Sequence, residues 1–462
     1  MDITRKLAEF TANTRFEDIP AEVIEVEKRS ILDNIAIISG GVDGDGCRQF
    51  VEFAEEMSAG GKGEATLLGY GKKLPAIWAA FANASMVMAL DFSDTSQTAT
   101  IHPNTSTFTV CLALAEKLGG VSGKDFLTAM VCGSEVACRL ARATQASRFA
   151  MYGYYMPPVF TSFGATAAAC KLLGLNADQI IDAWSLNLSQ YICSSELTKN
   201  KETPIRSVRE AFGAKAAMSS ALLAAKGIKG FKDPFEGEQG FYKAYFQNDY
   251  DPEPVLKDLG KLWEAQNLVF KPWPCCMGNH GCINAAMNIM KAHDIKPEDI
   301  TALKAEAPST ARVVLEPTED KKRPKNAINA KYSMPYTVST SIIDGQVTLS
   351  SFEQDKLSRP EILALADKFS HKLNDDWDKD PEMKTAGRLT IETKDGRSFT
   401  ELVVKTLGNP LNPMTDDAFA AKFHSCMDLA DAPRTRDEQD QIMEHVKSLE
   451  TINDMRDIAA ML

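Results

Sequence analysis

The sequence predicts a mainly α-helical protein with a large all-helical domain and a smaller α+β domain. Helical segments follow one another up to about residue 266, with little alternation at a period of two. Strand-like alternation begins only after residue 270. The length of 462 residues also exceeds what a single core usually organises. We expect residues 1–270 and 406–462 to form the helical domain and residues 271–405 to form the α+β domain.

The first long predicted helix begins at Pro20 and runs to Ile38, with apolar residues recurring on one face. Gly40 and Gly41 follow it, as glycines commonly follow the end of a helix. Several later segments are rich in Ala, Gly and Ser, which lets helices approach one another closely. Further helices are predicted at residues 75–90, 104–118, 123–143, 163–173, 177–188 and 210–226.

The predicted strands lie in the second domain. Residues 300–307 and 346–350 alternate as strands do, and residues 388–393 and 398–405 flank Asp395-Gly396, a strong hairpin turn signal. A stretch rich in Gly and Pro at 408–413 indicates a linker, and the sequence from Thr415 returns to helical periodicity. We expect this tail to pack on the first domain.

Composition narrows the class of protein. An apolar fraction of 44% and a charged fraction of 25% are typical of a soluble globular protein. The formal net charge of −12 argues against nucleic acid as a partner, although a few local cations could still bind a small acid. No run is long and apolar enough to cross a membrane and the N-terminus is unlike a signal peptide, so we expect a cytoplasmic protein. The ten cysteines lie mostly in apolar contexts and are predicted to be reduced.

The most informative motif comprises residues 89–95 (ALDFSDT) followed by Ile101-His102-Pro103. His102 can titrate near neutral pH, and a nearby carboxylate such as Asp91 would orient its ring and raise its pKa, as general acid/base catalysis requires. The alternative is that these polar residues only cap a helix or form a turn.

A second motif surrounds Lys271, where nearby prolines fix the backbone. Lys271 would hold a substrate carboxylate or serve as an acid. Cys275, Cys276 and His280 invite a zinc interpretation, but adjacent cysteines suit one tetrahedral ion poorly and no Cys-x-x-Cys pair exists elsewhere, so no metal is predicted. No electropositive setting marks Cys276 as a nucleophile. The glycine-rich segments near residues 60 and 70 lack the spacing of a nucleotide site.

Together these segments resemble the MmgE/PrpD family, whose members include 2-methylcitrate dehydratase, cis-aconitate decarboxylase and iminodisuccinate epimerase. The landmarks, which cover most of the chain, are Leu32-Asp33 before Gly40-Gly41, residues 89–95 with His102-Pro103, Phe163-Gly164-Ala165 through Leu175, residues 227–230, residues 271–276 with His280, residues 330–336, and residues 408–413 with Lys422-Phe423. The resemblance implies a homodimer of two-domain subunits, in which the α+β domain is a lid, with no metal or organic cofactor.

The resemblance also assigns site residues. By position, family active-site residues are matched by Asp91, Thr95, His102, Lys271 and Tyr336.

At three positions the chain departs from the family pattern. Met156 stands where the dehydratases and the decarboxylase tend to carry a histidine, Arg206 stands for a lysine, and Cys276 stands where the decarboxylase has a further histidine. Arg206 keeps the charge and can bind a carboxylate with two hydrogen bonds, whereas Met156 can neither shuttle a proton nor bind charge. We expect all three, with His280 and Thr95, to be candidates for binding substrate.

Taken with the resemblance, these residues lead us to expect a lyase that adds water to, or removes it from, a small di- or tricarboxylate of the citrate type. Lys271 and Arg206 would hold carboxylates and stabilise the charge that develops when a C–H bond breaks. His102, oriented by Asp91, would transfer the proton, with Tyr336 as partner acid or hydrogen-bond donor.

Three alternatives remain at this point. An epimerase of a substituted succinate would need proton removal and return but no leaving-group acid, which fits a methionine at position 156. A decarboxylase fits less well, because two of its histidines are absent. A non-catalytic relative that only binds an organic acid is disfavoured by the intact matching residues.

Overall fold

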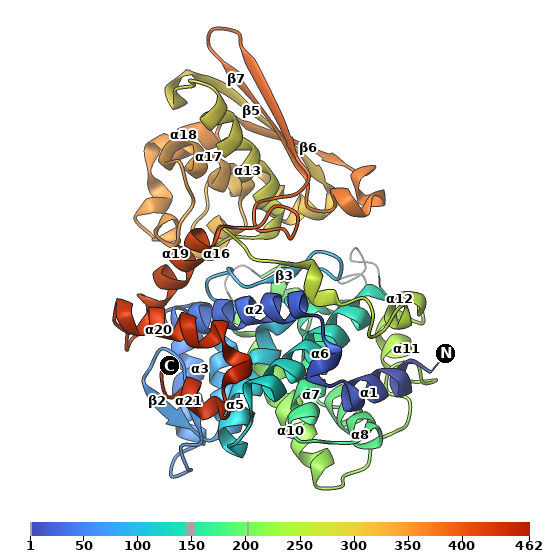
Figure 1. Cartoon of the computed structure of the whole chain (residues 1–462). Coiled ribbons are helices and arrows are strands. Elements are labelled where there is room, and N and C mark those ends of the chain that lie inside the picture. The colour runs from blue at the N-terminus through green and yellow to red at the C-terminus, as the bar shows by residue number, and fades with distance from the viewer. Residues whose placement is uncertain (1, 145–152, 201–202) are drawn as a thin grey trace. The chain divides into compact units, whose positions relative to one another are not determined.

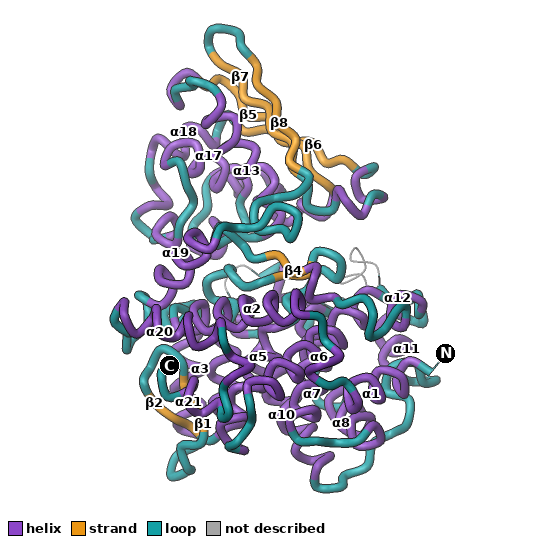
Figure 2. Tube along the Cα trace, viewed as in Figure 1, coloured by secondary structure: helices purple, strands orange, loops and turns teal. Residues whose placement is uncertain are grey.

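Two units, each with its own core, make up the chain. The structure is a computed structural model that describes residues 2–144, 153–200 and 203–462. Contacts between Cα atoms group Met1–Phe270 with Ala420–Leu462 as the first unit, and Lys271–Phe419 as the second. Helices dominate the first unit, whereas the second combines helices with the larger of the sheets (Figure 2). The protein is therefore mainly α with a smaller α+β part, as its sequence predicts.

The first unit is a helical assembly with two small two-stranded sheets, β1 with β2 and β3 with β4. Its elements before the second unit are α1 (Ile3–Asn13), α2 (Ala21–Ser39), α3 (Cys47–Met57), β1 (Ala65–Leu67), β2 (Lys72–Leu74), α4 (Ala76–Met86), β3 (Thr95–Ser96), α5 (Asn104–Leu118), α6 (Gly123–Arg142), α7 (Pro157–Leu172), α8 (Ala177–Leu188), α9 (Ile205–Val208), α10 (Glu210–Ala225), α11 (Phe241–Phe246), α12 (Glu253–Leu256) and β4 (Leu268–Val269).

Close packing of α5, α6, α7 and α10 forms the centre of this unit (Figure 1). A Cβ atom added to Gly133 of α6 would lie 2.9 Å from the carbonyl oxygen of Gly164 in α7, and one added to Gly164 would lie 2.4 Å from that of Gly133. The small residues seen in the sequence therefore permit this approach. Helix α7 begins at Pro157, six residues earlier than predicted, because proline is well suited to the first turn of a helix.

The C-terminal segment completes the first unit with α20 (Arg436–Lys447) and α21 (Met455–Ala459), after α19 (Asp416–Met427) has brought the chain back from the second unit. Helix α20 lies beside α2, so the two ends of the sequence pack together (Figure 1). Its first turn is stabilised by a capping box between Thr435 and Glu438.

The second unit packs helices against a four-stranded sheet of order β6-β5-β7-β8, in which β5 and β6 are parallel and the other pairs antiparallel. Its elements are α13 (Met277–Ala292), β5 (Ile300–Pro308), α14 (Arg312–Leu315), α15 (Thr318–Lys322), α16 (Ala327–Lys331), α17 (Met334–Asp344), α18 (Pro360–Ala366), β6 (Phe369–Asn374), β7 (Gly387–Thr393) and β8 (Ser398–Val403). Its apolar core lies between the sheet and the helices α13 and α17.

The strand predictions had mixed outcomes. The hairpin is confirmed, since β7 and β8 pair with Glu392 opposite Ser398, and Gly396 has the positive φ of 82° that the turn requires. The predicted strand at 346–350 is wrong: this stretch leads into a short 3₁₀ helix, Leu349–Phe352, because Thr348 forms a capping box there. Strand β6 was not predicted, because its burial is only partial and its sequence mixes charged and apolar residues.

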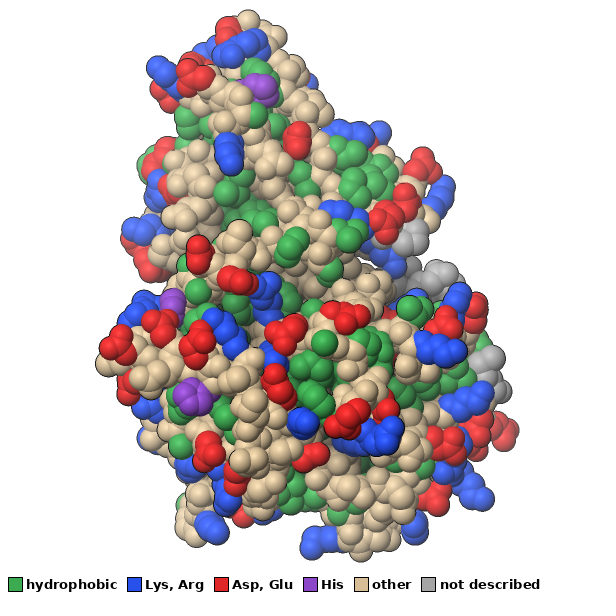
Figure 3. Space-filling model, in the orientation of Figure 1, with side chains coloured by type: hydrophobic (Ala, Val, Ile, Leu, Met, Phe, Trp, Pro, Cys, Tyr) green, Lys and Arg blue, Asp and Glu red, His purple; other side chains and the backbone are tan. Residues whose placement is uncertain are grey.

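The second boundary lies at Ala420, later than the expected position near 406. The intervening segment belongs with α13, since the Leu407 N–H donates to Asn284 Oδ1 over 2.8 Å. None of the helices in the described part of the chain is long and apolar enough to cross a membrane. On the face seen in Figure 3, acidic and basic side chains are interspersed over both units.

Candidate active site

The loop between α4 and α5 is tightly folded. Asp91 and Thr100 both have left-handed backbones, with φ of 52° and 57°. The Thr100 N–H donates to the Ser96 carbonyl over 2.8 Å, and the Ser96 N–H donates to the Ile101 carbonyl over 2.9 Å. The Thr95 hydroxyl adds a 3.1 Å bond to the same Ile101 oxygen. Two unusual backbone conformations held by several hydrogen bonds are typical of functional loops.

His102 lies at the end of this loop with a defined ring orientation. Its Nδ1 atom lies 2.8 Å from the carbonyl oxygen of Asp94 and 3.1 Å from the hydroxyl of Ser93. A carbonyl can only accept, so Nδ1 carries the hydrogen. In the neutral ring Nε2 therefore holds the lone pair. The main-chain carbonyl of Asp94 thus orients the His102 ring at Nδ1, the role that we expected of Asp91. That Asp91 also acts on this ring stays a prediction.

The side chain of Asp94 is buried directly behind the loop. Its Oδ2 atom accepts hydrogen bonds from Ser30 of α2 over 2.6 Å and from Asn104 of α5 over 3.1 Å. Its backbone N–H donates to Asp33 Oδ2 over 3.0 Å. Burial and the neighbouring Asp33 carboxylate raise the pKa of Asp94 to about 7. The carboxyl group of Asp94 thus anchors the loop to α2 and α5, and its burial makes its ionisation unfavourable.

The segment before Lys271 is fastened to the same loop. Strands β3 and β4 pair with Thr95 opposite Val269, although these residues are far apart in the sequence. The Thr98 hydroxyl also donates to Glu264 Oε2 over 3.1 Å. Lys271 follows β4 by two residues. The main chain that leads to Lys271 is therefore held against the strand that carries Thr95.

The segment that carries Arg206 is linked to the helix that follows His102. Arg206 lies in α9, and four residues later the buried Glu210 begins α10. Glu210 Oε2 accepts from Ser106 over 3.0 Å and from Thr161 over 3.2 Å, which joins α10 to the first turns of α5 and α7. Burial raises the pKa of Glu210. Arg206 and His102 thus belong to one hydrogen-bonded part of the first unit.

Met156 lies in the same part of the fold. It is buried immediately before α7, with a side chain that is 1% exposed. The preceding Tyr155 ring lies under the buried guanidinium of Arg209, whose Cζ atom is 5.5 Å from the ring centroid. The structure therefore brings Asp91, Thr95, His102, Met156 and Arg206 into one unit around α5, α7 and α9.

The second unit holds Cys276 and His280. Cys276 occupies the position before the first turn of α13 without a capping hydrogen bond from its side chain, and its N–H donates to the Lys331 carbonyl over 3.1 Å. His280 is fully buried, with Nε2 3.2 Å from the Cys275 carbonyl and its ring 5.2 Å from that of Trp273. This environment is that of a core histidine. Among the residues that the structure describes, no group of three or more His, Cys, Asp or Glu side chains is arranged to hold a metal ion.

Tyr336 also lies in the core of the second unit. It is in the first turn of α17 and is fully buried. Its hydroxyl donates to the Ser351 carbonyl over 2.7 Å. Burial raises the pKa of this phenol to about 12. The hydroxyl is thus engaged by the backbone, so packing and hydrogen bonding explain its presence without a role as an acid.

Sequence reasoning missed the residues that support the loop. Ser30 and Asp33 lie on the buried face of α2, beside Ile31 and Ile35, and Asn104 opens α5. A polar side chain within the apolar face of a predicted helix needs a buried partner. This signal was available in the sequence, but it does not say which partner that is.

Comparison with known proteins gives two matching domain models and several similar enzymes. The MmgE/PrpD N-terminal domain model matches residues 5–253, and the MmgE/PrpD C-terminal domain model matches residues 273–449. The chain is 27% identical to a cis-aconitate decarboxylase of Aspergillus terreus, over 96% of this chain and 92% of the relative. A mouse cis-aconitate decarboxylase is also 27% identical, over 98% and 91%. A 2-methylcitrate dehydratase of Salmonella typhi is 24% identical, over 72% and 71%.

The two matching domain models together cover most of the chain and divide where the structure divides it, at about residue 270. Several relatives with enzymatic names match over nearly their full length. The chain therefore belongs to the MmgE/PrpD family.

Proposed function

We propose that the protein is a lyase that acts on a small di- or tricarboxylate by acid/base catalysis, with His102 as the proton-transferring group. The observation that carries this proposal is the hydrogen bond from His102 Nδ1 to the Asp94 carbonyl. It leaves Nε2 as the basic atom of the neutral ring. A histidine with one fixed tautomer, on a rigid loop, is suited to remove a proton from a carbon atom next to a carboxylate.

Lys271 and Arg206 would bind the carboxylates of the substrate. Both are cations in a chain of net negative charge, so local positive groups must provide the attraction. When the C–H bond breaks, negative charge moves onto the adjacent carboxylate, and a nearby cation stabilises it. The guanidinium of Arg206 can form two parallel hydrogen bonds with a carboxylate. The pairing of β3 with β4 supports a shared role for Lys271 and the loop of Thr95.

We propose a dehydratase or hydratase as the leading reaction. His102 Nε2 would take the proton from carbon, and the departing hydroxyl would leave as water after receiving a proton from the Lys271 ammonium. Lys271 replaces Tyr336 as the acid, because the Tyr336 hydroxyl donates to the Ser351 carbonyl. Asp91, Thr95, Met156 and Cys276 would line the substrate site. His280 would support it only as part of the core.

Decarboxylation is the second candidate, because the relatives named cis-aconitate decarboxylase match over almost the whole chain. In this reaction the C–C bond to a carboxylate breaks and His102 would return a proton to the resulting carbanion. Cys276, at a position where the decarboxylase pattern has a further histidine, argues against it, whereas Met156 departs from the dehydratase and decarboxylase patterns alike. Epimerisation of a substituted succinate would require only proton removal and return.

One experiment distinguishes these reactions. The full-length protein is incubated in deuterium oxide with citrate, 2-methylcitrate, cis-aconitate and substituted succinates, and the products are followed by NMR and by carbon dioxide release. Dehydration gives an alkene without carbon dioxide, and decarboxylation gives carbon dioxide. Epimerisation places deuterium at the stereocentre without either product. Thermal-shift measurements with the same acids would identify a protein that binds without turnover.

The role of His102 is tested by His102→Ala. We expect a loss of at least about 10²-fold in kcat, the scale of one general acid/base. His445→Ala is the control, because His445 is an exposed histidine on α20 in the same unit. Full activity of correctly folded His102→Ala would exclude the proposed mechanism.

We also propose that the protein is a cytoplasmic homodimer that needs no metal or organic cofactor, as its family resemblance implies. Proton transfer between the residues above requires no such group. Light scattering measures the mass in solution. Activity that survives dialysis against a chelator would agree with the proposal, and loss that added metal restores would contradict it.

A further inference from the structure

A buried lysine from the C-terminal segment lies behind the candidate catalytic loop. Lys422 is on α19, and its side chain is 3% exposed. Its Nζ atom lies 2.5 Å from Asp33 Oδ1 and donates to the Phe92 carbonyl over 2.8 Å. The same atom lies 4.1 Å from the centroid of the Phe92 ring. One ammonium group therefore contacts a carboxylate, a main-chain oxygen and an aromatic face, each of which favours a cation.

These contacts continue without interruption to His102. The second carboxylate oxygen of Asp33 accepts the Asp94 N–H over 3.0 Å. The carbonyl of Asp94 in turn accepts the hydrogen of His102 Nδ1 over 2.8 Å. Lys422 thus holds the main chain of residues 92–94 at two points. It donates directly to the Phe92 carbonyl, and through Asp33 it reaches the N–H of Asp94.

We propose that Lys422 is a positioning residue, which holds the main chain of residues 92–94 so that the Asp94 carbonyl keeps His102 in a single tautomer. The proposal rests on the proposed function of His102. Its physical basis is that a hydrogen-bonded ion pair in a buried, low-dielectric setting is rigid and depends on both partners. Without the ammonium, Asp33 would be a buried charge without its counter-ion, and the Phe92 carbonyl would lose its donor.

The docking of α19 explains how a residue so late in the chain reaches this loop. Helix α2 carries Asp33 and ends at Ser39, and Gly40 follows it. A Cβ atom on Gly40 would lie 2.4 Å from the carbonyl oxygen of Cys426, which is one turn after Lys422 on α19. Gly40, which follows the end of α2, therefore also permits close contact with α19.

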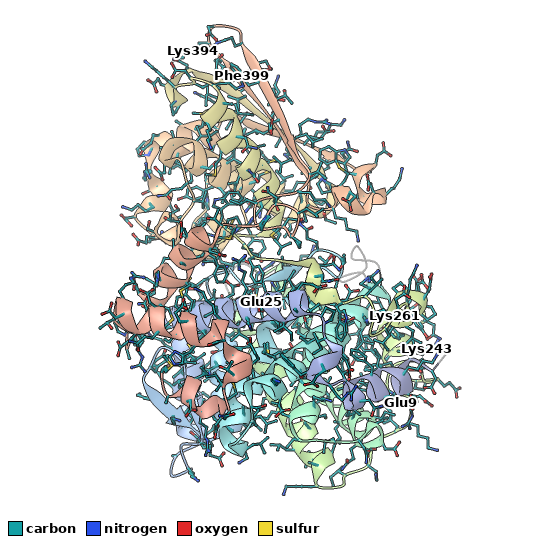
Figure 4. The ribbon with its side chains drawn as sticks, viewed as in Figure 1. Glu9, Glu25, Lys243, Lys261, Lys394 and Phe399 are labelled. Carbon is teal, nitrogen blue, oxygen red and sulfur yellow. The ribbon has the colours of Figure 1, made fainter. Side chains whose placement is uncertain are left out.

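The chain offers a matched control for Lys422. Lys28 is a second buried lysine that links α2 to the C-terminal segment, with a side chain 5% exposed. Its Nζ atom lies 2.8 Å from Glu25, 2.7 Å from Glu450 and 2.8 Å from the Lys447 carbonyl. Figure 4 labels Glu25 on α2. Lys28 makes contacts similar in kind to those of Lys422, but none of them leads to the loop of His102.

The experiment compares Lys422→Met with Lys28→Met in the full-length protein. We expect Lys422→Met to lower kcat by about 10-fold to 10²-fold, the scale of a small misplacement of a catalytic group, with a smaller change in KM. Lys28→Met should keep kcat within about 2-fold, because its effect is confined to stability. Equal kcat values for the two variants would overturn the proposal.

Imidazole ¹⁵N chemical shifts of histidine-labelled protein provide a measurement that does not depend on activity. Assigned by their loss in His102→Ala, they should report one tautomer with the hydrogen on Nδ1 in the wild type and in Lys28→Met. Lys422→Met should give averaged shifts of two tautomers. A single unchanged tautomer in Lys422→Met would overturn the positioning role even if the proposed reaction proves correct. Averaged shifts in an enzyme that does not need His102 would contradict only the proposed function.

A second variant covers failure of Lys422→Met to fold. The double variant Asp33→Asn/Lys422→Met removes both charges of this ion pair. The new amide oxygen at position 33 can still accept the Asp94 N–H. The Phe92 carbonyl still lacks its donor, so we expect lowered kcat and averaged ¹⁵N shifts in a folded protein. Wild-type values for both would show that the ammonium does not position His102.

Discussion

The loop from Asp91 to Pro103 and the segment from Lys271 to His280 each carry a histidine whose ring donates to a main-chain carbonyl, but their surroundings differ. Around His102 the buried groups are ionisable: Asp94, Asp33 and Lys422 all lie behind the loop. The ring of His280 instead packs beside Trp273, which belongs to the apolar core of the second unit.

This difference teaches that the buried neighbours of a histidine indicate whether it serves function or packing. A buried cluster of charges costs free energy to desolvate, and groups with perturbed pKa values gather at functional sites. An apolar core around a histidine indicates that packing alone suffices to explain it. The predictions below test this contrast, from the largest expected effect to the smallest.

The largest expected effect separates the two histidines directly. We expect His102→Ala to lose at least about 10²-fold in kcat with little loss of stability, because the ring is only partly buried. His280→Ala should keep kcat per folded molecule but lower the free energy of unfolding by about 2 to 4 kcal/mol, as deletion of a buried side chain does. Kinetics and urea unfolding on both variants measure the two effects. The reverse pattern would refute the contrast.

Much of the fold could be predicted because local patterns dictate it. The periodicity of residues 104–118 and 177–188 gave helices that match α5 and α8 at both ends. The turn chemistry of Asp395-Gly396 gave the β7–β8 hairpin. The predicted strand at 346–350 failed because a capping interaction of Thr348, which depends on the backbone after α17, outweighed the alternating pattern.

The candidate site could be predicted only in part. His102 and Lys271 stand out from sequence because titratable residues beside turns and prolines are conspicuous. The pairing of β3 with β4 could not be predicted, because each strand has only two residues and the pairing joins Thr95 to Val269 across most of the first unit. The contact of Lys422 with Asp33 is equally non-local. Such partners are selected by tertiary packing, which a single sequence does not encode as a local pattern.

A smaller effect is expected from two glycines, one near each region. Gly40→Ala would place a Cβ atom 2.4 Å from the backbone oxygen of Cys426, so we expect a loss of about 1 to 3 kcal/mol in stability and a lower kcat as α19 shifts. Gly278→Ala in α13 would place a Cβ atom 3.2 Å from the Val314 side chain and 3.7 Å from the Ala311 Cα atom, the second of which is an ordinary contact. It should be neutral, or stabilising by up to about 1 kcal/mol through helix propensity. Equal effects in chemical denaturation would contradict this.

Asp94 should make the stability of the protein depend on pH. Its pKa is raised to about 7 in the folded protein, above the ordinary 3.8, because of burial and the Asp33 charge. The folded state therefore binds the proton of the Asp94 carboxyl more tightly than the unfolded state does. The stability that this proton contributes is complete below about pH 4 and is lost as the pH rises through 7.

Asp94→Asn removes this titration and keeps an oxygen that can accept from Ser30. Between pH 5 and pH 7.5, the wild type should lose at least about 1 kcal/mol more stability than the variant, since one pKa unit corresponds to about 1.4 kcal/mol. Urea unfolding at both pH values measures the difference. Parallel pH profiles would show that Asp94 is ionised over the whole range.

The smallest expected effect concerns Tyr336. Because its hydroxyl donates to the Ser351 carbonyl, Tyr336→Phe should cost about 1 to 2 kcal/mol of stability and leave kcat within about 3-fold. Tyr242→Phe is the matched control, since Tyr242 is equally buried and donates to the Leu140 carbonyl over 3.0 Å in the first unit. Similar stability losses and unchanged turnover in both would place Tyr336 with His280 as a packing residue. If Tyr336→Phe alone slowed turnover by about 10²-fold or more, the phenol would instead be a participant in proton transfer, because one general acid contributes about that much.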